Sequence, residues 1–214
     1  TILTNESCVI NNYPSSLLDN KLHEEMLSVL GKKVNNIDEN VIKVHGQLNT
    51  SSLHWVKLSI RNTLLILGAL LTKTGKGKVP LPGGCKIGER KYDIHLGIMK
   101  KMGASVWEEN DYLCAEIKGR RLIGCNYVLP VRSTGATENA ILMATLAKGK
   151  TKIWNPHIRP EILDLIEMLK SMGAKIEVFG QESIEIEGVN YLKQVEHTCI
   201  PDNMEALTYV VAAA

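Results

Sequence analysis

Three stretches of this sequence share one pattern, and this repetition constrains the fold more than any other feature. Each stretch has apolar residues at helical spacing, then a glycine, then two short segments in which apolar and polar residues alternate. The stretches cover residues 22–44, 95–117 and 163–186. Each glycine suits the left-handed conformation that commonly ends a helix, and the three are Gly31, Gly103 and Gly173. We therefore predict three copies of one helix-strand-strand element.

A second set of matching pieces precedes these stretches. Short strands are predicted in "SCVINNYP", "GKVPLPG" and "GKTKIWNP", and we expect them to end at Pro14, Pro82 and Pro156. Two further helices, "RNTLLILGALLTKTG" and "TENAILMATLAKG", are apolar on nearly every face, which is typical of helices enclosed by protein. One unit therefore runs helix, strand, helix, strand, strand, with its first helix buried and its second amphipathic.

The units predict one compact α/β domain over residues 1–200, in which three copies close around shared helices with their sheets outside. The first copy lacks its buried helix. The segment "NMEALTYVVAAA" resembles the buried helix of a fourth unit, so we expect residues 201–214 to lead into a second domain. We interpret the sequence as part of a longer protein.

Composition narrows the function classes. A net charge of +2 in 214 residues gives no electrostatic case for nucleic acid, and one Phe gives no platform for stacking bases. The longest apolar run, residues 64–71, is too short to span a bilayer. Five cysteines without a C-x-x-C pair or a His at metal-ligand spacing suggest neither a zinc site nor a disulfide framework, so we expect a reducing cytoplasm.

The stretch "LPGGCKIGER" places Cys85 after two glycines and before Lys86 and Arg90. Glycines permit a mobile, exposed backbone, and nearby cations favour the thiolate form of a cysteine. The alternative is a structural thiol in a surface loop. The residues by themselves support both interpretations about equally.

Several motifs together resemble the UDP-N-acetylglucosamine enolpyruvyl transferases. They are "VPLPGGCKIGERKYDIHL", "STGATENAILMATLAKG", "NPHIRPEILDLIEMLKSMGAKI", "IEIEGV" and "HTCIPDNMEALTYVVAAA", and they follow one another along nearly the whole chain. The resemblance implies two similar domains of three βαβαββ units each, arranged as an inside-out α/β barrel with helices inside. It also implies transfer of the enolpyruvyl group of phosphoenolpyruvate to the nucleotide sugar, without cofactor or metal.

The resemblance assigns roles to particular residues. Cys85 matches the family's loop cysteine, which donates a proton to the enolpyruvyl methylene and is alkylated by the epoxide antibiotic fosfomycin. Arg90 would contact the phosphates of both ligands, and Arg61 would hold the phosphoenolpyruvate side, since guanidinium grips oxyanions bidentately. A solvated surface arginine is the ordinary alternative, although a charge at the start of an apolar helix is unusual and helix N-termini attract anions.

The nucleotide is expected at a second group of positions. Ser133, Thr134 and Gly135 open a buried helix, where hydroxyls and unpaired N–H groups bind a diphosphate or, equally, cap the helix. Asp93 and Ile94 match positions that line the uracil pocket, and Asp93 is as well suited to be an N-cap. We expect His95 to be a packing or capping residue. The remaining cysteines, which lack the cationic setting of Cys85, are expected to be packing residues: Cys8, Cys114, Cys125 and Cys199.

Departures from the family pattern leave alternatives open. Ile158, Arg159 and Asn203 stand where the family usually has Arg, Glu and Arg, and Lys91 replaces a common proline. A divergent transferase with another acceptor, or a non-catalytic module that binds a nucleotide sugar, therefore competes with the leading interpretation. Because the family's active site lies between two domains, we predict that the chain alone is inactive.

Overall fold

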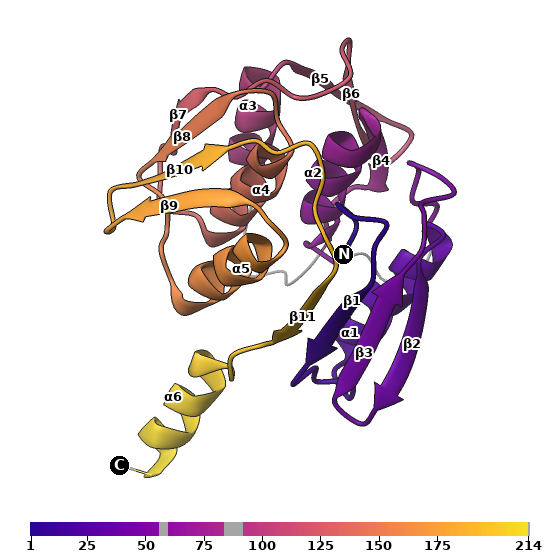
Figure 1. Cartoon of the computed structure of the whole chain (residues 1–214), viewed down its shortest axis with the longest axis vertical. Helices are drawn as coiled ribbons and strands as arrows, with labels where there is room; N and C mark the ends of the chain where they lie inside the picture. Colours follow the sequence, from indigo (N-terminus) through magenta and orange to yellow (C-terminus); the bar gives the residue numbers. More distant parts are fainter. Residues whose placement is uncertain (56–59, 84–91, 214) are drawn as a thin grey trace.

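The computed structural model describes residues 1–55, 60–83 and 92–213, and it has a mixed α/β fold with three small sheets. Figure 1 shows the sheets around a group of helices. Cys85, Arg90 and Lys91 lie outside the described residues, so the predictions for them stay predictions.

The first unit forms a sheet with the order β11-β1-β3-β2. Strand β11, from the far end of the sequence, pairs in parallel with β1, and the other neighbours are antiparallel. Helix α1 buries Leu22 and Met26. The elements are β1 (Cys8–Asn11), α1 (Leu18–Val29), β2 (Lys33–Asp38), β3 (Val41–His45) and β11 (Val195–Thr198).

The second unit forms the sheet β4-β6-β5, with all neighbours antiparallel. An isolated parallel bridge between Ser52 and Lys78 occupies the place that β11 has in the first sheet. The elements are α2 (Thr63–Thr74), β4 (Lys76–Pro80), α3 (Asp93–Lys101), β5 (Ala104–Glu109) and β6 (Tyr112–Ile117).

The third unit repeats the same plan with the order β7-β8-β10-β9. Strand β7 is parallel to β8, and β10 is antiparallel to both β8 and β9. The elements are β7 (Asn126–Val128), α4 (Thr134–Thr145), β8 (Lys150–Trp154), α5 (Pro160–Ser171), β9 (Lys175–Phe179) and β10 (Ser183–Glu187). The predicted threefold repeat is therefore confirmed at the level of strand order.

The three predicted helix-ending glycines have nearly the same backbone. Gly31, Gly103 and Gly173 have φ of +99°, +95° and +98°, which side-chain-bearing residues rarely adopt. The strand ends were predicted less well. The strands end at Asn11, Pro80 and Trp154, two or three residues before the prolines. In the first and third units the next residues, Asn12 and Asn155, turn the chain with φ of +55° and +56°.

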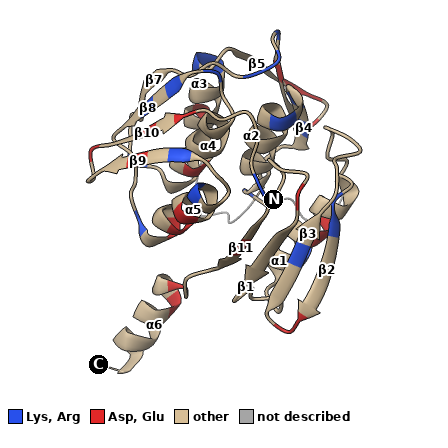
Figure 2. Cartoon of the chain, viewed as in Figure 1, with Lys and Arg blue, Asp and Glu red and all other residues tan. Residues whose placement is uncertain are grey.

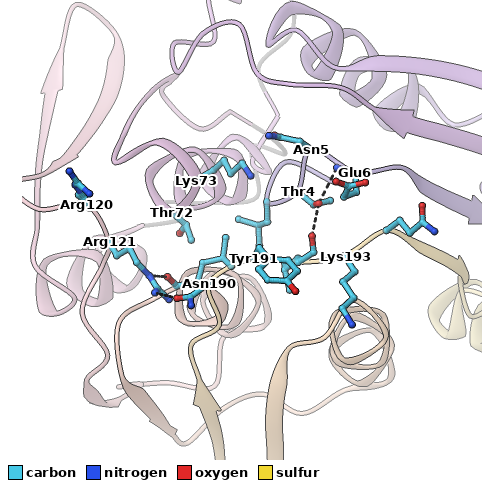
Figure 3. A pocket seen from close by; sticks show the side chains of 14 residues that line it. Thr4, Asn5, Glu6, Thr72, Lys73, Arg120, Arg121, Asn190, Tyr191 and Lys193 are labelled. Atoms are coloured by element: carbon cyan, nitrogen blue, oxygen red, sulfur yellow. Dashed lines mark hydrogen bonds between the residues drawn. The ribbon is translucent and has the colours of Figure 1, made fainter.

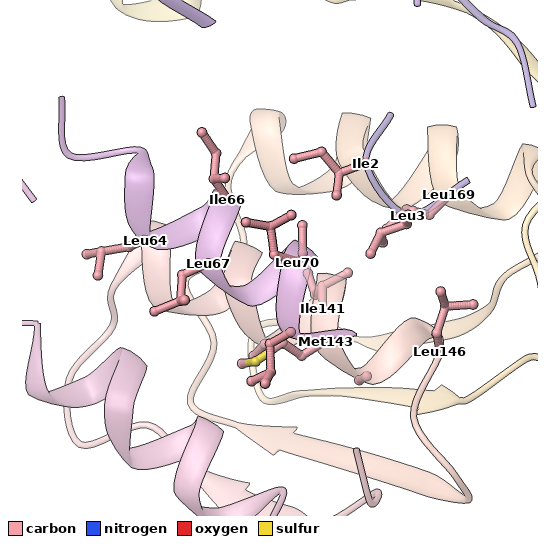
Figure 4. Packing of buried hydrophobic residues seen from close by; sticks show 14 of the residues in the cluster. Ile2, Leu3, Leu64, Ile66, Leu67, Leu70, Ile141, Met143, Leu146 and Leu169 are labelled. Carbon is pink, nitrogen blue, oxygen red and sulfur yellow. The ribbon is translucent and has the colours of Figure 1, made fainter. Parts of the chain in front are cut away.

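Helices α2 and α4 form the centre of the core, as their all-round apolar character predicted. Nine of the twelve residues of α2 are buried, and eight of the twelve of α4. Figure 4 shows leucines of α2 against Ile141 and Met143 of α4. Each fully buried side chain of this size contributes about 2 kcal/mol to the free energy of folding, relative to an exposed one. The packing of α2 against α4 is therefore a main source of stability.

Helix α6 (Asn203–Ala213) differs from the other helices, because none of its residues is buried and it projects from the body in Figure 1. Asp202 caps it by accepting bonds from the N–H groups of Met204 and Glu205. Its expected burial as part of a fourth unit stays a prediction. In the described residues, no helix combines the length and apolar character needed to cross a bilayer. Figure 2 shows Lys and Arg interspersed with Asp and Glu over the sheets and helices.

Candidate functional site

The first turns of α2, α3 and α4 meet at one end of the core. Asn139 of α4 links them, because its Nδ2 lies 3.1 Å from the carbonyl of Leu64 and 3.0 Å from Nδ1 of His95. A Cβ on Gly135 would lie 3.5 Å from Cε1 of His95. Since helix N-termini carry partial positive charge, this arrangement favours anions. The six predicted site residues that are described lie at these three helix starts: Arg61, Asp93, Ile94, Ser133, Thr134 and Gly135.

Arg61 is half-buried and precedes α2 by two residues. Its charge reaches His95, because burial and then the Arg61 guanidinium lower the pKa of His95 to about 4, against an opposing effect of Asp93. The imidazole is therefore neutral at physiological pH. The N–H groups of Thr63, Leu64 and Leu65 already donate to carbonyls of residues 60–62. The start of α2 therefore contributes to this site through the charge of the neighbouring Arg61, and the first backbone N–H groups of the helix are already paired.

Helix α4 opens differently. Ser133 is its N-cap, and its Oγ accepts a bond from the N–H of Ala136 at 3.3 Å. The Thr134 hydroxyl lies 2.8 Å from Nδ1 of His157. Within the described part of the chain, the N–H groups of Thr134 and Gly135 donate no hydrogen bond. Capping by Ser133 therefore leaves two adjacent N–H groups available for an anion.

Asp93 is the first residue of α3, and Tyr92 is the N-cap, so the alternative that Asp93 caps the helix is wrong by one position. Its exposed carboxylate lies close enough to Tyr127 of β7 to contribute, after burial, to a raised pKa of that phenol. Ile94 is half-buried against the core. His95 is buried and bonded to Asn139, which confirms its expected packing role.

The residues before α5 cover the start of α4. The N–H of His157 donates to Oγ1 of Thr137 at 3.1 Å, and Arg159 forms a 2.9 Å ion pair with Glu161. Burial, and then the charge of Glu161, raise the pKa of Glu138 to about 7. The departures at Ile158 and Arg159 thus lie beside the candidate site, next to a carboxyl group that titrates near neutrality.

Sequence reasoning missed Glu138, Asn139 and His157. The first two were a signal in themselves, since they are adjacent polar residues inside the otherwise apolar stretch "TENAILMATLAKG". A polar group in a helix that is buried on nearly every face needs a partner. The identity of the partners, residues 64, 95 and 161, depends on contacts between units that sequence alone does not contain.

A pocket of about 630 Å³ lies at the opposite ends of α2 and α4, and its lining includes Thr72, Lys73 and Leu146 (Figure 3). One of its cations, Arg121, has structural bonds to the carbonyls of Leu146, Ala147 and Val189 and to the side chain of Asn190. These bonds hold the chain that leaves β10 against the end of α4. The Arg121 guanidinium is therefore a clasp, and the helix starts at the other end make the better candidate site.

Comparison with known proteins agrees with this fold. The sequence profile described as EPSP synthase (3-phosphoshikimate 1-carboxyvinyltransferase) matches residues 1–214. The chain is 41% identical over 221 residues to a UDP-N-acetylglucosamine 1-carboxyvinyltransferase of Prochlorococcus marinus, with 100% of this chain and 47% of the relative covered. A protein of the same name from Granulibacter bethesdensis is 41% identical over 216 residues, with 100% of this chain and 51% of the relative covered.

Solved structures show the same fold at lower identity. The enolpyruvyl transferase NikO from Streptomyces tendae has a TM-score of 0.83 at 21% identity, with 99% of this chain and 50% of that one covered. An EPSP synthase from Acinetobacter baumannii has a TM-score of 0.75 at 18% identity, with 100% of this chain and 49% of that one covered. The chain spans about half the length of the curated relatives it matches.

Proposed function

The chain belongs to the EPSP synthase family of carboxyvinyltransferases, and from this premise we propose that its protein transfers the enolpyruvyl group of phosphoenolpyruvate to the 3-hydroxyl of UDP-N-acetylglucosamine. The observation that carries the proposal is the 41% identity, along the whole chain, to proteins named for that acceptor. Phosphate is the second product. The reaction is the first committed step of peptidoglycan synthesis, and we place the protein in the cytoplasm.

The chemistry needs an acid and several cations. Protonation of the methylene carbon makes C2 electrophilic, and the sugar hydroxyl adds there and loses its proton. Loss of phosphate from C2 and of a proton from the new methyl group then restores the double bond. Proton donation and electrostatic stabilisation of the phosphate are the contributions a protein can make. We assign the proton to Cys85 and the phosphate and carboxylate contacts to Arg61 and Arg90. No cofactor or metal is required for these steps.

The nucleotide sugar is assigned to the starts of α3 and α4. The N–H groups of Thr134 and Gly135 donate no bond within the described residues, and they supply two donors at the positive end of α4, which suits the diphosphate. Ser133 keeps this turn in place through its cap. Asp93 and Ile94, at the start of the neighbouring helix α3, are assigned to the uracil side.

The architecture fits this assignment. We propose that residues 1–200 are the first of two enolpyruvyl transferase domains and that residues 201–214 lead into the second. The repeated strand orders and the enclosed helices α2 and α4 support an inside-out barrel. The second domain would supply the rest of the active site.

A divergent acceptor is the second candidate, because one observation favours it. Arg159 pairs with Glu161 beside the start of α4, at a position where the resembled family usually has a glutamate. This reversal of charge would change which polar groups of the acceptor are bound. A module that binds the nucleotide sugar without catalysis is the third.

Phosphate release by the full-length protein tests these candidates. With phosphoenolpyruvate and UDP-N-acetylglucosamine, we expect turnover that is abolished in C85S. The control C125S, which changes a half-buried cysteine, should retain it. Turnover with 3-phosphoshikimate instead would favour a different acceptor. Binding of the nucleotide sugar without phosphate release would favour the module. The 214-residue chain alone should release no phosphate above a C85S control.

In the same protein, fosfomycin should add to Cys85 faster when UDP-N-acetylglucosamine is present, as peptide mapping by mass spectrometry can show. A single adduct on Cys85 supports a reactive thiol. If a general alkylating reagent modifies Cys85 but fosfomycin does not, the proposed role of this cysteine is wrong.

A further inference from the structure

Three metal-ligating side chains meet where α5 packs on β11, and none of them is among the residues assigned above. Across residues 1–55, 60–83 and 92–213, one group of three such residues has all its ligand atoms within 4.8 Å of one another: Asp164, His197 and Cys199. Nε2 of His197 lies 3.0 Å from Oδ1 of Asp164. Only 9% of the His197 side chain and 16% of the Asp164 side chain are exposed. The cluster is therefore partly shielded from water.

The fold holds these ligands on ordered elements. His197 and Cys199 are two residues apart on an extended segment, so their side chains leave it on the same face. The N–H of Cys199 donates to the carbonyl of Asn11 at 3.1 Å, and its own carbonyl accepts from Nδ2 of Asn12 at 2.9 Å. Asp164 lies in the second turn of α5, which packs against β11. Positions fixed by regular structure make a preorganised ligand set.

The donor atoms indicate which metal suits them. One thiolate sulfur, one imidazole nitrogen and one carboxylate oxygen form a borderline-soft set that matches Zn²⁺. In a tetrahedral zinc site with ligands at about 2.0 to 2.3 Å, neighbouring donor atoms lie roughly 3.3 to 3.8 Å apart. The observed separations, 3.0 Å for one pair and no more than 4.8 Å for the others, require only small side-chain movements.

We propose that Asp164, His197 and Cys199 form a three-ligand zinc site whose fourth position is filled by water. Binding breaks the S–H bond of Cys199 and forms a Zn–S bond, and the proton passes to solvent.

The site would act as a clamp between units. Strand β11 pairs with β1 in the first sheet, whereas α5 belongs to the third unit. A metal shared by both would hold the first sheet to the third unit. Because binding to the folded state stabilises it by mass action, zinc at 100 times its Kd should raise the thermal midpoint by roughly 5 to 10 °C.

Spectroscopic titration of the reduced, metal-free, full-length protein with Co²⁺ tests the proposal, since Co²⁺ reports a thiolate ligand through a charge-transfer band. We expect one band that saturates at one equivalent, disappears on addition of Zn²⁺, is absent in C199S and is retained in C85S and C125S. D164N should weaken Co²⁺ binding at least tenfold, and it keeps a side chain that can bond His197.

Three results would overturn the proposal: no saturable band in the wild-type protein, a band that persists in C199S, or a band that is lost in C85S or C125S. If C199S does not fold, the D164N comparison decides, since unchanged Co²⁺ affinity in that variant excludes Asp164 as a ligand. None of these measurements depends on enolpyruvyl transfer, so the outcome is independent of the proposed function.

Discussion

Replacement of Gly68 by alanine should weaken the packing of α2 against α4, which positions the candidate site. A Cβ at this position would lie 1.8 Å from Oδ1 and 2.9 Å from Cγ of Asn139, whereas real Cβ contacts essentially never fall below 3.0 Å. Asn139 is fully buried, and its Nδ2 serves both Leu64 and His95. The amide therefore has no room to turn away without loss of both hydrogen bonds.

The size of the effect follows from two opposing contributions. Alanine is a better helix former than glycine by about 1 kcal/mol. Against this, rotation of the Asn139 amide would forfeit two hydrogen bonds and leave buried polar groups unpaired, at a cost of about 3 to 5 kcal/mol. Separation of the helices instead would strain the packed core by about 3 kcal/mol or more, because the overlap is severe. We expect G68A to lower the free energy of unfolding by a net 2 to 4 kcal/mol, roughly.

Urea unfolding followed by circular dichroism measures this change, with G119A as the control. Gly119 has open space around it, with the nearest atom at 3.9 Å, so G119A should stay within about 0.5 kcal/mol of wild type. N139A removes the obstructing carbonyl. The loss of unfolding free energy in the G68A/N139A double variant should therefore be smaller, by at least about 1 kcal/mol, than the sum of the losses in the two single variants. A G68A variant as stable as wild type, or additive losses, would refute the steric argument.

Three further predictions concern titration and the Arg121 clasp. Because the folded pKa of Glu138, about 7, lies above the ordinary 4.5, folding takes up a proton and stability falls as pH rises from 4.5 through 7. E138Q should therefore gain about 2 kcal/mol over wild type at pH 8 but not at pH 5, as urea unfolding can show. The lowered pKa of His95, about 4, means that its stabilising contribution is present above pH 6.5 and is lost as pH falls towards 4. Its imidazole NMR signals should not titrate near 6.5, and a midpoint there would contradict its burial beside Arg61. R121K should lower the free energy of unfolding by about 2 to 3 kcal/mol in urea melts, since one ammonium cannot reach four acceptors, whereas R120K, at an exposed neighbour, should change little.

Local signals in the sequence predicted the repeat well. Gly31, Gly103 and Gly173 lie at helix ends where the backbone needs φ near +95°. Glycine adopts this conformation without strain, so the identity of one residue is enough to predict the helix end. The all-round apolar patterns likewise predicted the burial of α2 and α4. Strand ends were harder to predict, because Asn12 and Asn155 adopt left-handed backbone that asparagine tolerates but does not require.

Contacts between units could not be predicted in this way. Asn139 bonds to residues 75 and 44 positions away, and nothing local in the sequence reports that His95 is its partner. The cluster at Asp164 was missed for the same reason, since His197 and Cys199 come from a strand that joins the first sheet while Asp164 lies in the third unit. The expectation of no metal ligands rested on spacing within the sequence, which does not detect ligands from separate elements.

Hydrogen exchange of the full-length protein, with UDP-N-acetylglucosamine binding verified by calorimetry, tests the central claim most directly. We predict that the nucleotide sugar slows exchange at the starts of α3 and α4, above all at the N–H groups of Thr134 and Gly135. The pocket around Lys73 and Lys193 should not change. Verified binding that protects that pocket, or that leaves the start of α4 unprotected, would contradict the account.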